Sequence, residues 1–259
     1  MSDTTTVDTD GAIRAHEVTK QFRGGVVALE SVSMSIRERE FSAVIGPSGC
    51  GKSTLLRLIA GLIPATSGVV TIDGERVTGP RPDVTMMFQK PTLLPWKDAL
   101  GNALLPQTIN GSATSEAKKK ALGLLYLLGL QGFEYHYPRH LSGGMEQRVA
   151  LARLLMVGAK FVLLDEPFGA LDEFTRERLN LELMSLHASA HLTTMLVTHN
   201  ISEAILLSDR VIVMTDRPGK IAGVVDVPFE RPRAIELQRR PEFNELMFEV
   251  RDLLGEALR

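Results

Sequence analysis

The segment at residues 46–54 constrains the fold of this chain more than any other feature. It reads G-P-S-G-C-G-K-S-T and follows an apolar run at 41–45 that predicts a buried strand, while residues 52–61 have helical spacing. Glycines let the backbone curl so that several N–H groups point at one anion, and the helix start adds the positive end of its dipole. The sequence therefore predicts a phosphate-binding loop. A glycine-rich turn without a ligand is the alternative, and the strand–loop–helix setting argues against it.

Individual residues of this loop have distinct expected roles. Lys52 supplies a compact cation for the β- and γ-phosphates, and Ser53 offers a hydroxyl to Mg²⁺. Cys50 is interpreted as a tolerated small residue, although a thiol reagent there should block nucleotide binding. The residues of the loop expected to bind nucleotide are Gly46, Pro47, Ser48, Gly49, Cys50, Gly51, Lys52, Ser53 and Thr54.

Two carboxylates follow a second apolar run. Residues 161–164 predict a buried strand, and Asp165 and Glu166 come directly after it. Carboxylates at the C-terminal edge of an open α/β sheet face the ligand crevice. Asp165 is therefore expected to hold Mg²⁺, and Glu166 to accept a proton from an attacking water. Two carboxylates in an ordinary turn are the alternative, and the apolar strand before them disfavours it.

A second glycine-rich helix start occurs at 141–148, which reads L-S-G-G-M-E-Q-R. One nucleotide needs one phosphate loop, so this segment has no obvious use inside the same nucleotide site. It makes sense if it completes the site of another copy, with Ser142 and the amides of Gly143 and Gly144 as the anion-binding groups. The sequence therefore predicts that dimerisation is part of the chemistry.

The order of predicted elements indicates an α/β fold. Strands are expected at 13–18, 28–36, 41–45, 69–72, 84–88, 161–164, 193–198, 210–215 and 221–225. Helical stretches at 172–190 and 200–208 alternate with the later strands, which implies a parallel sheet wound with helices. Between 90 and 157 leucine and alanine dominate, with helical patterns at 115–129 and 142–157, so we expect a helical subdomain inserted into the core. A last helix from Pro241 carries an apolar stripe expected to pack on the core.

Composition excludes several classes of function. The chain has 259 residues and a net charge of −2, so its charge does not indicate a basic surface for nucleic-acid binding. It has one cysteine, so no internal disulfide is possible. The polar segment 1–12 predicts no signal peptide, and no apolar run approaches the roughly 20 residues that span a bilayer. We expect a chain that does not cross the membrane itself but can sit on a protein that does.

The phosphate loop, L-S-G-G-M and L-L-D-E-P, in this order and spacing, resemble the nucleotide-binding subunit of ATP-binding cassette (ABC) transporters over nearly the whole chain. The resemblance implies a P-loop NTPase core with an N-terminal antiparallel β subdomain. It assigns residues 13–245 to the nucleotide-binding domain, with the helical subdomain at about 90–157, and 217–259 to a C-terminal strand and helix.

The same resemblance implies roles for single residues. Phe22 matches an aromatic that stacks on adenine, Gln89 a glutamine that senses Mg²⁺ and the attacking water, and His199 a histidine that contacts the γ-phosphate. The G-A-L-D segment at 169–172 matches a loop that crosses to the partner subunit, so Asp172 is expected to act in trans. Met145 departs from the common family form, which has glutamine, and its role stays open. Each lone residue has an ordinary structural reading as a core, capping or strand-end residue.

Three further segments, 89–96, 168–177 and 227–233, look like the nitrate/sulfonate/taurine importer branch, whose members also carry bicarbonate or pyrimidine precursors. This implies an ATPase on the cytoplasmic side of the inner membrane. Its partners would be an integral-membrane permease, a solute-binding protein reached indirectly, and a second copy or a paralogue. We expect a groove around 89–96 to receive a permease helix, with simple core burial of Leu93, Leu94 and Trp96 equally open.

The expected reaction is hydrolysis of ATP to ADP and phosphate. Glu166 polarises the water, and Lys52 and His199 stabilise the transferred phosphoryl group. A soluble ABC-type ATPase of DNA repair or chromosome structure is the alternative, and the missing coiled-coil insertion argues against it. A non-enzymatic nucleotide-binding scaffold is disfavoured because the chain carries all four residues expected for hydrolysis: Lys52, Asp165, Glu166 and His199. The sequence does not identify the solute, the choice between homodimer and heterodimer, or any regulation by the C-terminal segment.

Overall fold

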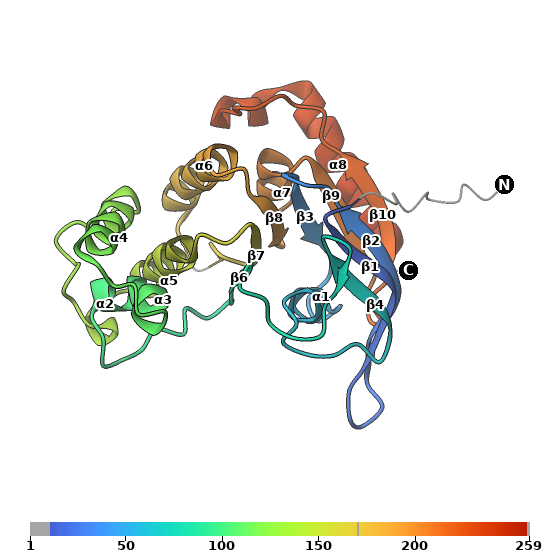
Figure 1. Cartoon of the computed structure of the whole chain (residues 1–259). Coiled ribbons are helices and arrows are strands. Elements are labelled where there is room, and N and C mark those ends of the chain that lie inside the picture. Colours follow the sequence, from blue (N-terminus) through green and yellow to red (C-terminus); the bar gives the residue numbers. More distant parts are fainter. Residues whose placement is uncertain (1–10, 170, 258–259) are drawn as a thin grey trace.

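The computed structural model describes residues 11–169 and 171–257 (Figure 1). Residues 1–10, which make up most of the polar segment that predicts no signal peptide, lie outside the described residues, as does Ala170 of the 169–172 loop. The chain forms two sheets and a separate group of helices, which agrees with the predicted α/β class.

The central sheet has six strands in the order β10-β9-β3-β8-β7-β6. They are β3 (Phe41–Ile45), β6 (Val84–Met87), β7 (Phe161–Asp165), β8 (Thr193–Val197), β9 (Arg210–Met214) and β10 (Ile221–Asp226). Every residue of β3, β7 and β8 is buried, as expected for parallel strands covered on both faces. β10 is antiparallel to β9, because the short turn between them cannot return the chain in a parallel direction. The predicted parallel sheet is confirmed, with this one antiparallel edge strand.

Parallel pairing aligns the strand ends that carry the candidate site. β3 pairs with β8, β8 with β7, and β7 with β6. The phosphate loop leaves the carboxyl end of β3 and enters α1 (Lys52–Ile59). The segments that follow β6, β7 and β8 begin at the same edge, so four distant parts of the chain meet there.

The second sheet is antiparallel, in the order β2-β1-β4-β5. It comprises β1 (Ile13–Gln21), β2 (Val27–Ile36), β4 (Ser67–Ile72) and the short β5 (Glu75–Arg76), which the sequence did not predict as a strand. Its buried face shares one apolar cluster with α1 and the central sheet, including Ile13, Leu55 and Phe161. This packing fixes β1 and β2 beside the phosphate loop.

The inserted helices are α2 (Ala99–Ala103), α3 (Leu105–Ile109), α4 (Ser115–Leu127) and α5 (Gly143–Val157), with a 3₁₀ turn at Pro138–His140. Figure 1 shows them in green and yellow-green at the side of the molecule away from the antiparallel sheet. They pack around a core that includes Leu125, Val149 and Leu151. The two five-residue helices were not predicted individually, because such short segments carry too few turns to show a helical period.

Three more helices cover the remaining faces: α6 (Glu173–Ser189), α7 (Ile201–Leu207) and α8 (Pro241–Ala257), the last preceded by a 3₁₀ helix at Ile235–Arg239. Phe243 and Val250 of α8 are fully buried against α7, β9 and β10. None of the helices in the described part of the chain has the length and apolar character needed to span a bilayer.

Candidate active site

The phosphate loop is curled around the ammonium group of Lys52. This residue begins α1 and is only 7% exposed, and its Nζ donates hydrogen bonds to the carbonyl oxygens of Gly46 at 2.7 Å and Pro47 at 2.8 Å. Gly51 caps the helix with φ 110°, where a Cβ atom would lie 2.7 Å from the carbonyl oxygen of Ala28. Only glycine fits this conformation and this close approach. The fold therefore presents the loop amides and a buried cation at one place.

A cavity of about 390 Å³ lies over this loop. It brings together Phe22, which follows β1, with the loop itself and with the segments after β6 and β7. The side chain of Phe22 is 41% exposed, so a face of its ring is available for stacking. The lining residues are Phe22, Val26, Ala28, Ser48, Gly49, Gly51, Lys52, Ser53, Thr54, Gln89, Glu166 and Arg217.

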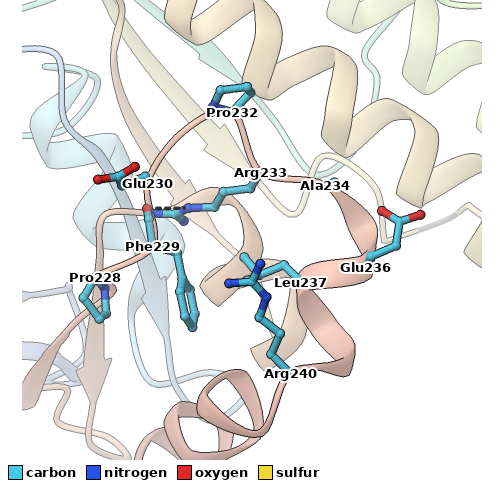
Figure 2. A pocket seen from close by; sticks show the side chains of 9 residues that line it. All are labelled: Pro228, Phe229, Glu230, Pro232, Arg233, Ala234, Glu236, Leu237 and Arg240. Carbon is cyan, nitrogen blue, oxygen red and sulfur yellow. Dashed lines mark hydrogen bonds between the residues drawn. The ribbon is translucent and has the colours of Figure 1, made fainter.

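A larger cavity, about 610 Å³, lies in the segment 228–240 (Figure 2). Its buried cation is Arg233, whose guanidinium already donates to the carbonyl oxygens of Ile205, Leu206 and Ser208. Those hydrogen bonds hold the segment 228–240 against α7, so the guanidinium of Arg233 has a structural role. The smaller cavity over the phosphate loop combines a cation, a hydroxyl and a carboxylate, and is the better candidate for chemistry.

Ser53 and Asp165 form the part of the site with the character of a metal shell. The Ser53 hydroxyl donates to Asp165 Oδ1 at 3.0 Å. Burial raises the pKa of the Asp165 carboxyl above its ordinary value, and the Ser53 hydrogen bond opposes this rise. The described residues contain no cluster of three His, Cys, Asp or Glu side chains suited to a metal. A pair of hard oxygen donors fits Mg²⁺, which takes one or two protein ligands and completes its shell with phosphate oxygens and water.

Glu166 is held in an unusual backbone conformation at the cavity wall. Its φ is 47°, a left-handed value uncommon outside glycine, and its N–H donates to the carbonyl oxygen of Val197 on β8. One carboxylate oxygen, Oε2, accepts a hydrogen bond from Gln89 Nε2 at 3.2 Å and lies 3.4 Å from His199 Nδ1. The structure thus brings together three residues that are far apart in sequence.

Gln89 and His199 occupy loops beyond their strands. The sequence predicts a strand at 84–88 with Gln89 at its end, but β6 ends at Met87, so Gln89 lies two residues past the strand. His199 lies between β8 and α7, with a side chain 64% exposed. His187, by contrast, is 4% exposed, its Nδ1 is 3.0 Å from Thr194 Oγ1, and burial lowers its pKa to about 4. His187 is therefore a structural residue of the core.

The residues expected to act in trans do not line the cavity of their own chain. Ser142 is the N-cap of α5 and its Oγ accepts from the N–H of Met145 at 3.3 Å. Ser142 and Gly143 are exposed, and the side chain of Met145 packs partly buried on the core of the helical subdomain. Asp172 is the exposed N-cap of α6, where the N–H of Thr175 lowers the pKa of the Asp172 carboxyl. Two capped helix starts therefore lie outside the lining of this cavity.

Sequence reasoning missed Arg217. The turn at 217–219 was predicted only as a turn, yet Arg217 lines the cavity, with Nη2 3.7 Å from the position of a Cβ on Gly49. A Cβ on Gly219 would lie 2.1 Å from the carbonyl oxygen of Cys50, so the turn presses directly on the phosphate loop. The only sign of this contact in the local sequence is Gly219, which permits the close approach of the turn to the loop. The contact depends on the β9–β10 hairpin, which sequence does not locate in space.

Comparison with known proteins gives four findings. A family model described as ABC transporter matches residues 29–169. Nitrate import ATP-binding protein NrtD of Synechococcus elongatus is 44% identical over 236 residues, covering 90% of this chain and 86% of the relative. Taurine import ATP-binding protein TauB of Rhizobium johnstonii is 42% identical over 234 residues, covering 88% and 89%. A solved dimeric ABC cassette bound to ADP and Pi has a TM-score of 0.76 at 33% identity, covering 84% of this chain and 100% of that one.

Proposed function

The chain belongs to the ABC transporter family, and from this premise we propose that it is the ATP-hydrolysing subunit of an importer for a small anionic or polar solute. Similarity to nitrate and taurine import ATP-binding proteins over most of the chain supports this solute class. The subunit would sit on the cytoplasmic side of the membrane, on a separate permease that a solute-binding protein feeds. The observation that carries the proposal is the Glu166 carboxylate, held by Gln89 and His199 on the wall of a cavity that contains a phosphate loop.

ATP would bind along the cavity with its adenine on the exposed ring of Phe22 and its phosphates on the loop 46–54. The two carbonyl bonds of Lys52 hold its ammonium at the loop, from where it can bind the β- and γ-phosphates. The loop amides and the start of α1 add further positive potential. Binding therefore needs little rearrangement of this half of the site.

Ser53, Asp165 and Gln89 are the residues that would hold Mg²⁺. The Ser53–Asp165 hydrogen bond keeps two of these oxygen donors together. When bound, Mg²⁺ supplies positive charge against the β- and γ-phosphate oxygens. Burial of Asp165 raises the pKa of its carboxyl, and a nearby cation would favour the ionised form.

Hydrolysis would proceed by attack of a water oxygen on the γ-phosphorus. The bond from that phosphorus to the β–γ bridging oxygen breaks, ADP leaves with the electron pair, and the water proton passes to Glu166. Gln89 orients the Glu166 carboxylate and the water beside it. His199 and Lys52 stabilise the negative charge that develops on the transferred group.

A second copy of the chain, or a paralogue, would complete each site. Ser142, Gly143 and Gly144 offer a hydroxyl and the free amides of a helix start, which suit a phosphate. Asp172 would approach from the neighbouring loop. The exposure of these groups, and the dimeric form of a similar cassette, support this arrangement. The backbone N–H of Met145 is occupied by Ser142, and its side chain packs inward, so Met145 contributes mainly to packing.

The permease would contact the loop around 89–96. Arg153 donates to the carbonyl oxygens of Pro91 at 2.7 Å and Thr92 at 3.0 Å, which fixes this loop against α5. Trp96 is 69% exposed, whereas Leu93 and Leu94 are partly buried. Of the three apolar residues considered, Trp96 is therefore the one available to a partner helix.

The substitution Glu166→Gln tests the proposal. It removes the proton acceptor but keeps a side chain of similar shape, so kcat should fall by roughly 10²–10⁴-fold while ATP still binds. The trapped nucleotide should also stabilise a dimer, which size-exclusion chromatography with ATP measures. Glu116→Gln on α4, an exposed residue of the helical subdomain, is the matched control and should hydrolyse ATP like the wild type. A Glu166→Gln protein with normal turnover that stays monomeric would overturn the assignment.

A further inference from the structure

Glu203 is a buried carboxylate that the proposed mechanism does not use. It is the third residue of α7 and only 6% exposed. Its carboxylate Oε2 accepts a hydrogen bond from the hydroxyl of Thr198. Its backbone N–H donates to Asn200 Oδ1 at 3.0 Å, the N-cap bond of α7. Glu203 thus binds both residues that flank His199.

These bonds close the short loop that carries His199. The Thr198 hydroxyl, besides donating to Glu203, accepts from the N–H of Asn200 at 3.1 Å. The His199 backbone therefore lies inside a small hydrogen-bonded ring whose anchor is Glu203. The Nδ1 atom of the exposed imidazole lies 3.4 Å from Glu166 Oε2. Its proposed contact with the γ-phosphate therefore depends on the backbone that this ring holds.

Two residues of α6 face the same carboxylate. Burial raises the pKa of the Glu203 carboxyl, and the Thr198 hydroxyl, the charge of Arg176 and the side chain of Asn180 oppose this rise. Arg176 Nη2 also donates to the carbonyl oxygen of Leu171 at 2.9 Å. The carboxylate is therefore enclosed between α6, α7 and the end of β8.

Three polar atoms of this cluster have no hydrogen-bond partner in the described part of the chain. Glu203 Oε1, Asn180 Oδ1 and Arg176 Nε are buried without a hydrogen-bond partner among the described residues. Unsatisfied buried polar atoms destabilise a fold, and apolar side chains of similar volume often replace buried charges without loss.

We propose that Glu203 is a positioning residue for the hydrolysis reaction, which holds the loop 198–200 so that His199 faces the γ-phosphate. The proposal rests on the proposed function, because it assigns Glu203 a role only through His199. Glu203 is only 6% exposed and its carboxylate accepts from Thr198, so in this proposal it does not touch the nucleotide itself. Its loss should therefore affect turnover and spare nucleotide binding.

The experiment is steady-state ATP hydrolysis by the full chain with Glu203→Ala, Glu203→Gln, His199→Ala and the double variant His199→Ala/Glu203→Ala. Small displacements of a reacting group lower rates up to about 10²-fold, so Glu203→Ala should lower kcat by about 10- to 100-fold. The KM for ATP should stay within about twofold, because the phosphate loop is untouched. Glu203→Gln keeps an oxygen that accepts from Thr198 and should rescue most of kcat. The double variant should be no slower than His199→Ala, because the two residues act as one unit.

Glu40→Ala is the matched control for loss of a buried carboxylate. Glu40 is also 6% exposed and accepts from Arg210 Nε at 2.8 Å, but it precedes β3 at the opposite, amino edge of the sheet. This variant should lose stability in thermal unfolding and keep the wild-type kcat per folded molecule. If Glu203→Ala does not fold, Thr198→Val removes the same bond at nearly constant shape and should give the same loss of kcat.

The outcomes separate the two proposals. A wild-type protein that does not hydrolyse ATP refutes the proposed function. A wild-type protein that does, with Glu203→Ala at the wild-type rate, refutes only the positioning role. Losses that multiply in the double variant, or a KM that rises in proportion to the fall in kcat, would also refute it.

Discussion

Within one chain, the two halves of the candidate site are held differently. Lys52, Ser53 and Glu166 all hydrogen-bond to other parts of the carboxyl edge of the sheet. Among the described residues, Ser142 and Asp172 hydrogen-bond only to the first turns of their own helices, α5 and α6, and both are exposed. The first half rests on fully buried strands, and the second on two helix starts.

This difference separates the residues that the fold positions within one chain from the residues that would act on the site of another copy. Groups that must meet the phosphates with fixed geometry are positioned by the fold before any ligand arrives. Groups that bind in trans keep their amides and hydroxyls free, because another surface must reach them. Hydrolysis would then depend on assembly, and binding would not. Each prediction below tests that division.

Among the substitutions that test this comparison, Ser142→Ala should have the largest effect. The substitution removes a hydroxyl that would bond a charged phosphate, an interaction of about 1.5–3 kcal/mol, so kcat should fall by roughly 10- to 100-fold. ATP affinity of the monomer, measured by titration calorimetry at low protein concentration, should stay unchanged. An equal loss of monomer affinity would place Ser142 in the site of its own chain and break the comparison.

Thr114→Ala separates this effect from loss of a helix cap. Thr114 is the N-cap of α4, where its hydroxyl accepts from the N–H of Ala117 at 3.2 Å, much like Ser142 on α5. Both substitutions should lower stability by about 1 kcal/mol. Only Ser142→Ala should slow hydrolysis.

A smaller effect is expected for Arg217→Ala, in the half held by the fold. The side chain lines the cavity beside Gly49, and its charge should attract the nucleotide phosphates. Because the residue is exposed and screened by solvent, its loss should weaken ATP binding only about three- to tenfold. Arg217→Lys should keep most of the affinity, and Arg251→Ala on α8 is the control. An unchanged dissociation constant in low salt would remove Arg217 from the site.

The smallest effect concerns the scaffold, through His187 beneath the central sheet. Burial lowers the pKa of His187 to about 4, below the ordinary value of 6.5. As the pH falls, His187 therefore takes up a proton in the unfolded chain at a higher pH than in the folded protein. The stability that the neutral, buried His187 contributes is present above pH 6.5 and is lost as the pH falls towards 4. Between pH 7 and pH 5 the free energy of unfolding should drop by about 2 kcal/mol from this residue. In urea unfolding, the free energy of unfolding of His187→Gln should fall less between pH 7 and pH 5 than that of the wild type. An equal fall in both proteins would show that His187 does not cause this pH dependence.

Much of the fold follows from local patterns. The strand, phosphate loop and helix at 41–59 were predicted because spacing and glycine content act within one short segment. The strand before Asp165 was predicted because four consecutive apolar residues end at two carboxylates. The short helices α2 and α3 and the strand β5 were missed because each is too short to show a period.

The sequence by itself determined that this chain has a phosphate loop with its own cation, a strand that ends in carboxylates and a second helix start suited to an anion. These are properties of neighbouring residues, and local chemistry is enough to encode them. Only the tertiary structure decided that Gln89 and His199 converge on one oxygen of Glu166, that Arg217 enters the cavity and that Trp96 stays exposed. Those facts depend on the order of strands in the sheet and on a hairpin between β9 and β10. Such long-range packing brings distant segments together, and no short stretch of sequence specifies it.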